Sequence, residues 1–109
     1  MKTALIAGLI ALTPTLAFAE AKLDKWQKSA LQLVKKEKQV TEAKWRDPKE
    51  NVLWVEVASD GSSRDGFAQY LCMVLMDAGA PEKALKTVWI YDKTGYVSGQ
   101  SALGMAACR

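Results

Sequence analysis

The chain has 109 residues, half of them hydrophobic and a quarter charged, with 15 basic and 12 acidic side chains. A formal charge of +3 is too balanced to indicate nucleic-acid binding, and the length leaves room for one domain. Histidine is absent, which excludes a Ser-His-Asp or Cys-His catalytic arrangement and removes the commonest metal ligand. We therefore expect a protein that is not an enzyme and that has no cofactor and no metal site.

Residues 1–19 have the three parts of a cleavable secretory signal. Lys2 supplies the initial positive charge, residues 4–12 are apolar, and Ala17 and Ala19 form a small-x-small cleavage site. A transmembrane anchor needs about 20 apolar residues, and this stretch is shorter. We expect cleavage after Ala19, a periplasmic or extracellular location and one domain over residues 20–109. The alternative is an N-terminal core helix, which would not require the three parts to occur in this order.

The mature chain begins with a predicted amphipathic helix over residues 21–38. Its apolar residues recur at steps of three and four and include Leu23, Trp26, Ala30 and Val34. Lysines occupy most of the other side. This period is typical of a helix that buries one face.

Two strands are predicted next. Residues 40–45 alternate, and residues 52–57 are β-branched and aromatic with a single charge. One side of the first strand consists of Thr41, Ala43 and Trp45. Residues 47–51 between them are typical of a turn, so we expect an antiparallel hairpin.

A second helix is predicted over residues 67–76, after a polar loop over residues 59–63 in which Ser62 or Ser63 would cap the helix. This helix is apolar on nearly every side, so we expect it to be covered on more than one side. Gly79 and Pro81 end it.

The rest of the chain predicts a third strand over residues 85–91, a turn over residues 92–95 and a short last strand within residues 102–108. The order helix, strand, strand, helix, strand and short last strand predicts an α+β domain. We expect an antiparallel sheet of three to four strands with two helices. The second helix would lie on the sheet and the first beside or over it.

The chain has two cysteines, Cys72 and Cys108. An exported chain passes through an oxidising compartment, where two cysteines usually pair. We expect a disulfide between them, which would stabilise the domain by about 4 kcal/mol in the loop-entropy model. An intermolecular bridge and two free thiols are the alternatives. A redox-active pair is disfavoured because Cys-x-x-Cys spacing is absent.

An Asp-Gly-Ser-x-Arg-x-Gly sequence over residues 60–66 follows a predicted strand and precedes the helix that carries Cys72. This arrangement resembles a group of short, uncharacterised exported bacterial proteins. They share an Asp-Gly-Ser/Thr-x-Arg-x-Gly loop, a helix cysteine and a C-terminal cysteine. Residues 103–108 match their closing segment. The resemblance supports the disulfide and the domain limits, and it implies no activity.

The densest polar cluster consists of Asp60, Ser62, Ser63, Arg64 and Asp65. A helix N-terminus offers free backbone N–H groups and a positive dipole end, so this loop with Arg64 could hold a carboxylate, phosphate or sulfate. In the structural alternative, Asp60 and Ser62 fold the turn, Asp65 favours the dipole and Arg64 pairs with an acid. The spacing of a calcium-binding loop is missing.

Basic residues concentrate near the start of the mature chain. Residues 20–46 hold eight basic and four acidic side chains, whereas the remainder holds six and eight. This asymmetry could face anionic lipid, glycan or an acidic partner. The alternative is a solvated helix face.

Three tryptophans, Trp45, Trp54 and Trp89, lie on predicted strands. Aromatic residues on one exposed sheet face could bind glycans or protein, but in so small a domain most of them should be core. Four sulfur residues could be soft ligands for Cu(I): Cys72, Met73, Met76 and Met105. Methionines on an apolar helix more often fill gaps in the core.

The sequence therefore predicts a small exported envelope protein that binds a protein partner or a small anionic ligand. The first alternative is an inhibitor or immunity protein of an envelope enzyme. The second is a carboxylate-based hydrolase, since pairs of acidic residues remain available. We expect no integral membrane anchor and no nucleic-acid partner.

Overall fold

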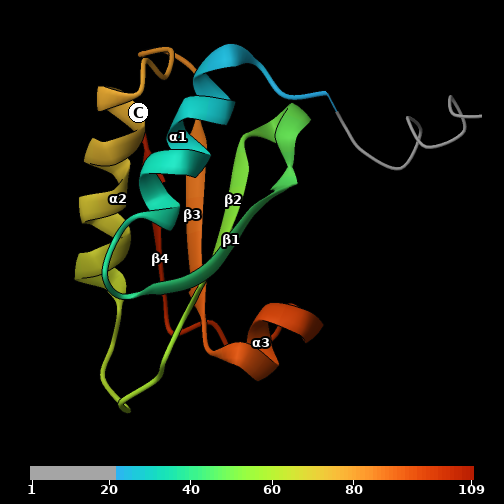
Figure 1. The fold of residues 1–109 in the computed structure, drawn as a ribbon. Helices are drawn as coiled ribbons and strands as arrows, with labels where there is room; N and C mark the ends of the chain where they lie inside the picture. Colours follow the sequence, from blue (N-terminus) through green and yellow to red (C-terminus); the bar gives the residue numbers. More distant parts are fainter. Residues whose placement is uncertain (1–21) are drawn as a thin grey trace, which may run out of the picture.

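A computed structural model describes residues 22–109, so the predicted signal and its cleavage site lie outside the described residues. The described elements are α1 (Lys25–Lys35), β1 (Val40–Asp47), the 3-10 turn η2 (Pro48–Glu50), β2 (Val52–Val57), α2 (Asp65–Asp77), β3 (Lys86–Tyr91), α3 (Lys93–Ser98) and β4 (Gly104–Cys108). Figure 1 shows their arrangement. No helix in this part of the chain is long and apolar enough to cross a membrane.

The strands form one sheet in the order β1-β2-β3-β4. The α+β class and the hairpin of β1 and β2 are confirmed. One pairing differs from the expected antiparallel sheet, because β2 and β3 are parallel, so the sheet is mixed. The reason is the connection: α2 carries the chain back to the end where β2 began, so β3 must run in the same direction as β2.

The structure also contains a helix that the sequence pattern did not predict. Residues 92–95, expected to be a plain turn, open the short helix α3. The Asp92 carboxylate accepts a hydrogen bond from the Gly95 backbone N–H at 2.8 Å, which caps the helix. The helix ends at Gly99, whose φ of 77° lies in the left-handed region.

Both long helices cover the same face of the sheet (Figure 1). The covered face carries the buried strand residues Ala43, Trp45, Leu53, Val55, Val57, Val88, Ile90, Ala106 and Cys108. Lys86 also lies on this face, and its side chain is fully buried, with Nζ donating to the Pro81 carbonyl at 2.6 Å. The core therefore lies between the sheet and the helical layer formed by α1 and α2.

As expected, α2 is covered on more than one side, by the sheet below it and by α1 on one flank, while its outer side is open. Tyr70, Met73 and Met76 are exposed there, and Met73 is 64% exposed. The reason is that α1 lies beside α2 on the sheet and not over it, so α2 meets neighbours only below and on one flank. The two methionines do not fill gaps in the core.

The expected disulfide is confirmed. Cys72 and Cys108 are bonded, with their Cα atoms 5.5 Å apart, and neither thiol is free. The bond joins the middle of α2 to the last residue of β4. The C-terminal strand is thereby fixed to the helical layer, as well as to β3 by its ladder.

Candidate functional site

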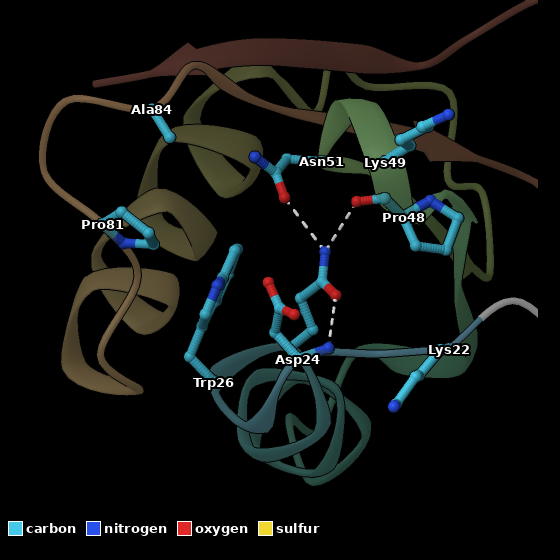
Figure 2. Close-up of a pocket in the computed structure, with 9 residues that line it drawn as sticks. Lys22, Asp24, Trp26, Pro48, Lys49, Asn51, Pro81 and Ala84 are labelled. Atoms are coloured by element: carbon cyan, nitrogen blue, oxygen red, sulfur yellow. Dashed lines mark hydrogen bonds between the residues drawn. The ribbon is translucent and has the colours of Figure 1, made fainter.

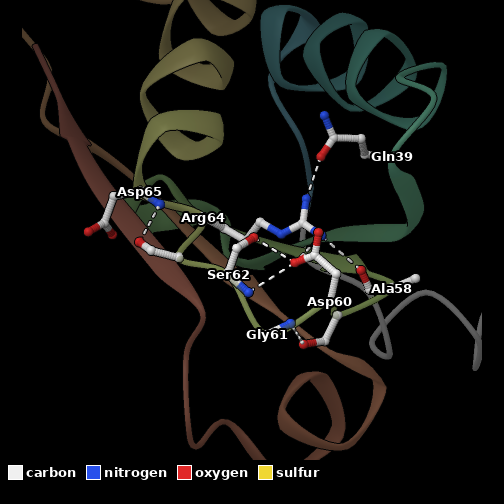
Figure 3. A network of polar contacts seen from close by, with 9 residues as sticks. Gln39, Ala58, Asp60, Gly61, Ser62, Arg64 and Asp65 are labelled. Carbon is white, nitrogen blue, oxygen red and sulfur yellow. Dashed lines mark hydrogen bonds and ion pairs between the residues drawn. The ribbon is translucent and has the colours of Figure 1, made fainter.

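The loop between β2 and α2 contains the five polar residues that the sequence singled out, and they do lie together (Figure 3). The Arg64 side chain is only 13% exposed. Its terminal nitrogens donate to Gln39 Oε1 at 2.6 Å and to the Ala58 carbonyl at 3.0 Å. The guanidinium also lies 3.5 Å from Asp60 Oδ1. Arg64 thus ties the start of β1 to the end of β2.

The turn at the tip of this loop is held by Asp60. Its carboxylate accepts hydrogen bonds from the Ser62 backbone N–H at 2.9 Å and from the Ser62 hydroxyl at 2.6 Å. These bonds with Ser62, aided by the charge of Arg64, hold the pKa of Asp60 below its ordinary value of 3.8. Gly61 between them has a φ of 87°, a conformation that favours glycine.

The end of the loop is fixed to β4. Asp65 Oδ1 accepts a hydrogen bond from the Met105 backbone N–H at 3.0 Å, and the Arg64 N–H donates to the Leu103 carbonyl at 2.9 Å. Gly104 packs so closely that an added Cβ would come 2.3 Å from the Arg64 carbonyl carbon. Ser63 Oγ accepts from the Asp65 N–H at 3.3 Å. The cluster therefore joins four segments, and Arg64 Nε is its one buried side-chain nitrogen without a partner within residues 22–109.

A cleft of about 590 Å³ lies at the opposite end of the molecule, between the start of α1, η2 and the segment before β3 (Figure 2). Trp26, Pro48 and Pro81 form apolar walls. In Figure 2 the Asp24 carboxylate points into the cleft, and the ends of Lys22 and Lys49 point away from its centre.

The floor of this cleft is a hydrogen-bonded joint. Gln27 is only 2% exposed, and its amide nitrogen donates to the Pro48 carbonyl at 2.9 Å and to Asn51 Oδ1 at 3.0 Å. Its Oε1 accepts from the Asp24 backbone N–H at 2.8 Å. Asn51 in turn donates to the Leu85 carbonyl at 3.3 Å. The side-chain amides of Gln27 and Asn51 are therefore occupied by hydrogen bonds within the protein. The floor of the cleft offers a ligand few free polar groups.

The sheet face opposite the two long helices carries a row of large side chains. Lys44, Trp54, Trp89 and Met105 stand at directly paired positions across β1, β2, β3 and β4. With strands about 4.8 Å apart, the row extends over about 14 Å. The tryptophans are partly exposed and Met105 is 39% exposed. We call these four residues the open sheet face.

Trp54 is held rigidly within the open sheet face. Its ring lies 4.8 Å from the Tyr91 ring and 6.4 Å from the Tyr96 ring, between ring centroids. A Cβ at Gly99 would come 2.7 Å from the indole, so only glycine lets the backbone after α3 reach this ring. Tyr96 of α3 and Gly99 after it therefore pack against Trp54.

Two cations surround Trp54. Lys44 Nζ lies 5.5 Å from the Trp54 ring centroid and 4.8 Å from that of Tyr96, and Arg46 Cζ lies 5.3 Å from the Trp54 centroid. These are cation–π distances. Neither cation forms a salt bridge with another residue in the described range 22–109. Burial, followed by the charges of Glu42 and Glu56, raises the pKa of Tyr96 to about 12.

The expectation that most of the strand tryptophans are core is wrong: Trp45 belongs to the core, whereas Trp54 and Trp89 lie on the face that the long helices leave uncovered. The Trp45 indole N–H donates to the Gln27 carbonyl at 2.9 Å, and its ring packs edge-on against Trp26 at 5.3 Å. The sequence contained a signal for Trp54, because Glu56 lies two residues away and therefore on the same face. The sequence contained no such indication for Trp89. The charged residue of its strand, Lys86, is buried on the covered face, so a charge on β3 does not mark the exposed face.

The remaining chemical candidates are dispersed or occupied. Met105 lies on the open sheet face, far from the α2 surface that carries Met73 and Met76, and Cys72 is in the disulfide. Within residues 22–109, no group of three or more acidic, cysteine or histidine side chains is placed to hold a metal. A second cleft, of about 370 Å³, is lined by two carboxylates, Glu56 and Asp92.

No family model, curated protein or solved structure matches this chain significantly. The resemblance to short exported bacterial proteins therefore stays a prediction. Function has to be inferred from the geometry of the described residues.

Proposed function

We propose that this chain is a small, exported, non-enzymatic protein of the cell envelope that binds a protein partner through the open sheet face. The observation that carries the proposal is the row formed by Trp54, Trp89 and Met105 on a face that neither α1 nor α2 covers. Tryptophan and methionine are enriched in protein interfaces, and tryptophan is frequent among the residues that dominate binding energy.

The charges on this face indicate the chemistry of the partner. Lys44 and Arg46 stand beside Trp54 and have no acidic partner among the described residues. A partner that presents an acidic side chain next to an apolar one would complete both the cation pairing and the burial of the indole rings. We propose a partner surface of this kind.

A small anionic ligand at the Asp60–Asp65 loop has weaker support. The terminal nitrogens of Arg64 already donate to Gln39 and Ala58 and lie near Asp60. An incoming phosphate or sulfate would have to replace these bonds and would meet the Asp60 charge. The geometry therefore favours the structural alternative for this loop.

The two alternatives use other parts of the same structure. An inhibitor or immunity protein would also use the open sheet face, and its partner would be an envelope enzyme with an acidic surface. A carboxylate-based hydrolase would need Glu56 and Asp92. These carboxylates already accept hydrogen bonds from the Thr41 hydroxyl and the Gly95 N–H, so they have less support as a catalytic pair.

The proposal of export rests on the order of regions in residues 1–19 and on the disulfide. A bond between Cys72 and Cys108 is typical of chains that fold in an oxidising compartment. Cleavage after Ala19 is part of the same proposal. Mass spectrometry of the protein recovered from the envelope would test it, and a mature N-terminus other than residue 20 would correct it.

Affinity capture from a periplasmic extract tests the binding proposal. The bait is the oxidised protein, compared with a Trp89→Ala/Met105→Ala variant and with a Leu33→Ala/Met73→Ala variant as the matched control. We expect a stoichiometric partner that the open-face variant loses and the control retains. Retention of the same partner by the open-face variant would contradict the proposal. Loss of an enzyme's activity in the complex would favour the inhibitor alternative.

A further inference from the structure

A second surface, on the outer side of the helical layer, combines exposed apolar side chains with cations. Four large hydrophobic residues are exposed there: Leu33 on α1 and Tyr70, Met73 and Met76 on α2. Isolated exposed apolar residues are ordinary, but a group on one layer indicates an interaction surface. We call these four residues the outer helical patch.

The geometry of the two helices places most of this patch across the seam between them. The Tyr70 hydroxyl donates to Glu37 Oε2 at 2.9 Å, which joins α2 to the end of α1. Leu33 is on the last turn of α1, the end of the helix nearest Glu37, and Met73 is one turn after Tyr70 on α2. Leu33, Tyr70 and Met73 therefore lie on adjoining outer surfaces.

Exposed lysines on α1 and at the residue that follows it add positive charge to the same helical layer. Lys25, Lys28 and Lys36 are exposed, and none of them forms a salt bridge within the described residues. Lys35 pairs with Glu42 at 3.7 Å and contributes less. On the other flank of α2, Met73 and Met76 line a shallow hollow of about 310 Å³ that Arg109 also borders. Two acids lie near Tyr70: Glu37, which accepts its hydrogen bond, and the exposed Asp77.

We propose that the outer helical patch lies against an anionic membrane surface. The apolar side chains of the patch would enter the headgroup region, while the long lysine side chains would reach the lipid phosphates. A protein partner fits less well, because the aromatic residue of the patch, Tyr70, is tied to Glu37, and the other members of the patch are flexible methionines and a leucine. This surface is on the opposite side of the sheet from the open sheet face, so the two would act independently.

Vesicle co-sedimentation tests the proposal. The probe is the oxidised protein recovered after export, with its N-terminus checked by mass spectrometry so that no uncleaved signal binds lipid. We expect binding to phosphatidylcholine vesicles that contain phosphatidylglycerol, weak binding to pure phosphatidylcholine, and a loss of affinity at high salt. Lys25→Gln, Lys28→Gln and Lys36→Gln should each reduce the affinity about fivefold.

Two further variants separate this surface from the proposed function. Leu33→Ser/Met73→Ser should reduce vesicle binding at low and high salt, whereas Trp89→Ala/Met105→Ala should leave it unchanged. The proposal is overturned by no binding to anionic vesicles, by equal binding to neutral ones, or by an unchanged affinity when Lys25→Gln, Lys28→Gln and Lys36→Gln are combined in one variant. Capture of a protein that depends on Leu33 and Met73, without vesicle binding, would assign the patch to a protein partner instead.

Discussion

Trp54 and Trp89 are paired in register on two parallel strands, on the sheet face that the long helices leave uncovered. Trp45 lies on the opposite face, in the core. Three tryptophans that look alike in the sequence therefore have two different environments. Trp54 and Trp89 are partly exposed on the open sheet face, and Trp45 is buried in the core.

This division predicts different costs for truncating each tryptophan. Trp45→Ala removes a side chain that is 8% exposed and a hydrogen bond to Gln27, so it should lower the free energy of unfolding by about 3–5 kcal/mol. Trp89→Ala, on the partly exposed face, should lower it by about 1 kcal/mol. Urea denaturation followed by circular dichroism measures both. Equal costs for the two variants would mean that Trp89 is also core.

Arg64 is predicted to act through stability. Arg64→Ala removes the donors to Gln39 and Ala58 and should lower the free energy of unfolding by about 1–3 kcal/mol. Arg64→Lys keeps the charge but cannot reach both acceptors in the same way. Its free energy of unfolding should therefore lie between those of the wild type and Arg64→Ala. Thermal unfolding with and without added phosphate is the measurement. An Arg64→Ala variant that keeps its stability but loses stabilisation by phosphate would restore the ligand-site interpretation.

The disulfide should contribute about 2–4 kcal/mol to the free energy of unfolding, because it constrains the unfolded chain across the segment from α2 to β4. The Cys72→Ser/Cys108→Ser variant and the wild type in reductant should show the same lowered urea midpoint. A wild-type midpoint that does not change in reductant would show that the bond adds nothing to stability.

The raised pKa of Tyr96 should make the folded protein lose stability at alkaline pH. Its pKa of about 12 in the folded chain is above its ordinary value of 10.0, so the folded state disfavours the charged tyrosinate. The contribution of Tyr96 is complete below pH 10 and is lost as the pH rises through about 12. Tyr96→Phe should lose less stability than the wild type over this range in urea melts. Parallel alkaline curves for the two proteins would rule out this role.

The α+β class, the hairpin and the Cys72–Cys108 bond were predictable from the sequence, because periodicity and cysteine count carry that information. The parallel pairing of β2 and β3 was not, since it depends on where α2 returns the chain. The short helix α3 was hidden because Asp92 and Gly95 are equally typical of a turn and of a capped helix.

The composition of the candidate loop was predictable from the sequence, but its geometry was not. The sequence placed Asp60, Ser62, Ser63, Arg64 and Asp65 together, and contacts join Asp60 to Ser62 and Arg64, and Ser63 to Asp65. It could not show that Arg64 turns inward to Gln39, a residue 25 positions earlier in the chain. The open sheet face was not predicted for a related reason, because the face that a strand buries depends on where the helices pack. On β3, a charged residue normally marks the exposed face, but Lys86 is buried on the covered face.

The most direct test of the central claim is the affinity of the captured partner for the wild type and for Trp89→Ala, measured by titration calorimetry on oxidised protein. The structure predicts a loss of at least about 30-fold, as for a hot-spot aromatic residue, with the fold intact by circular dichroism. An affinity that does not change on removal of the Trp89 ring would contradict binding through the open sheet face.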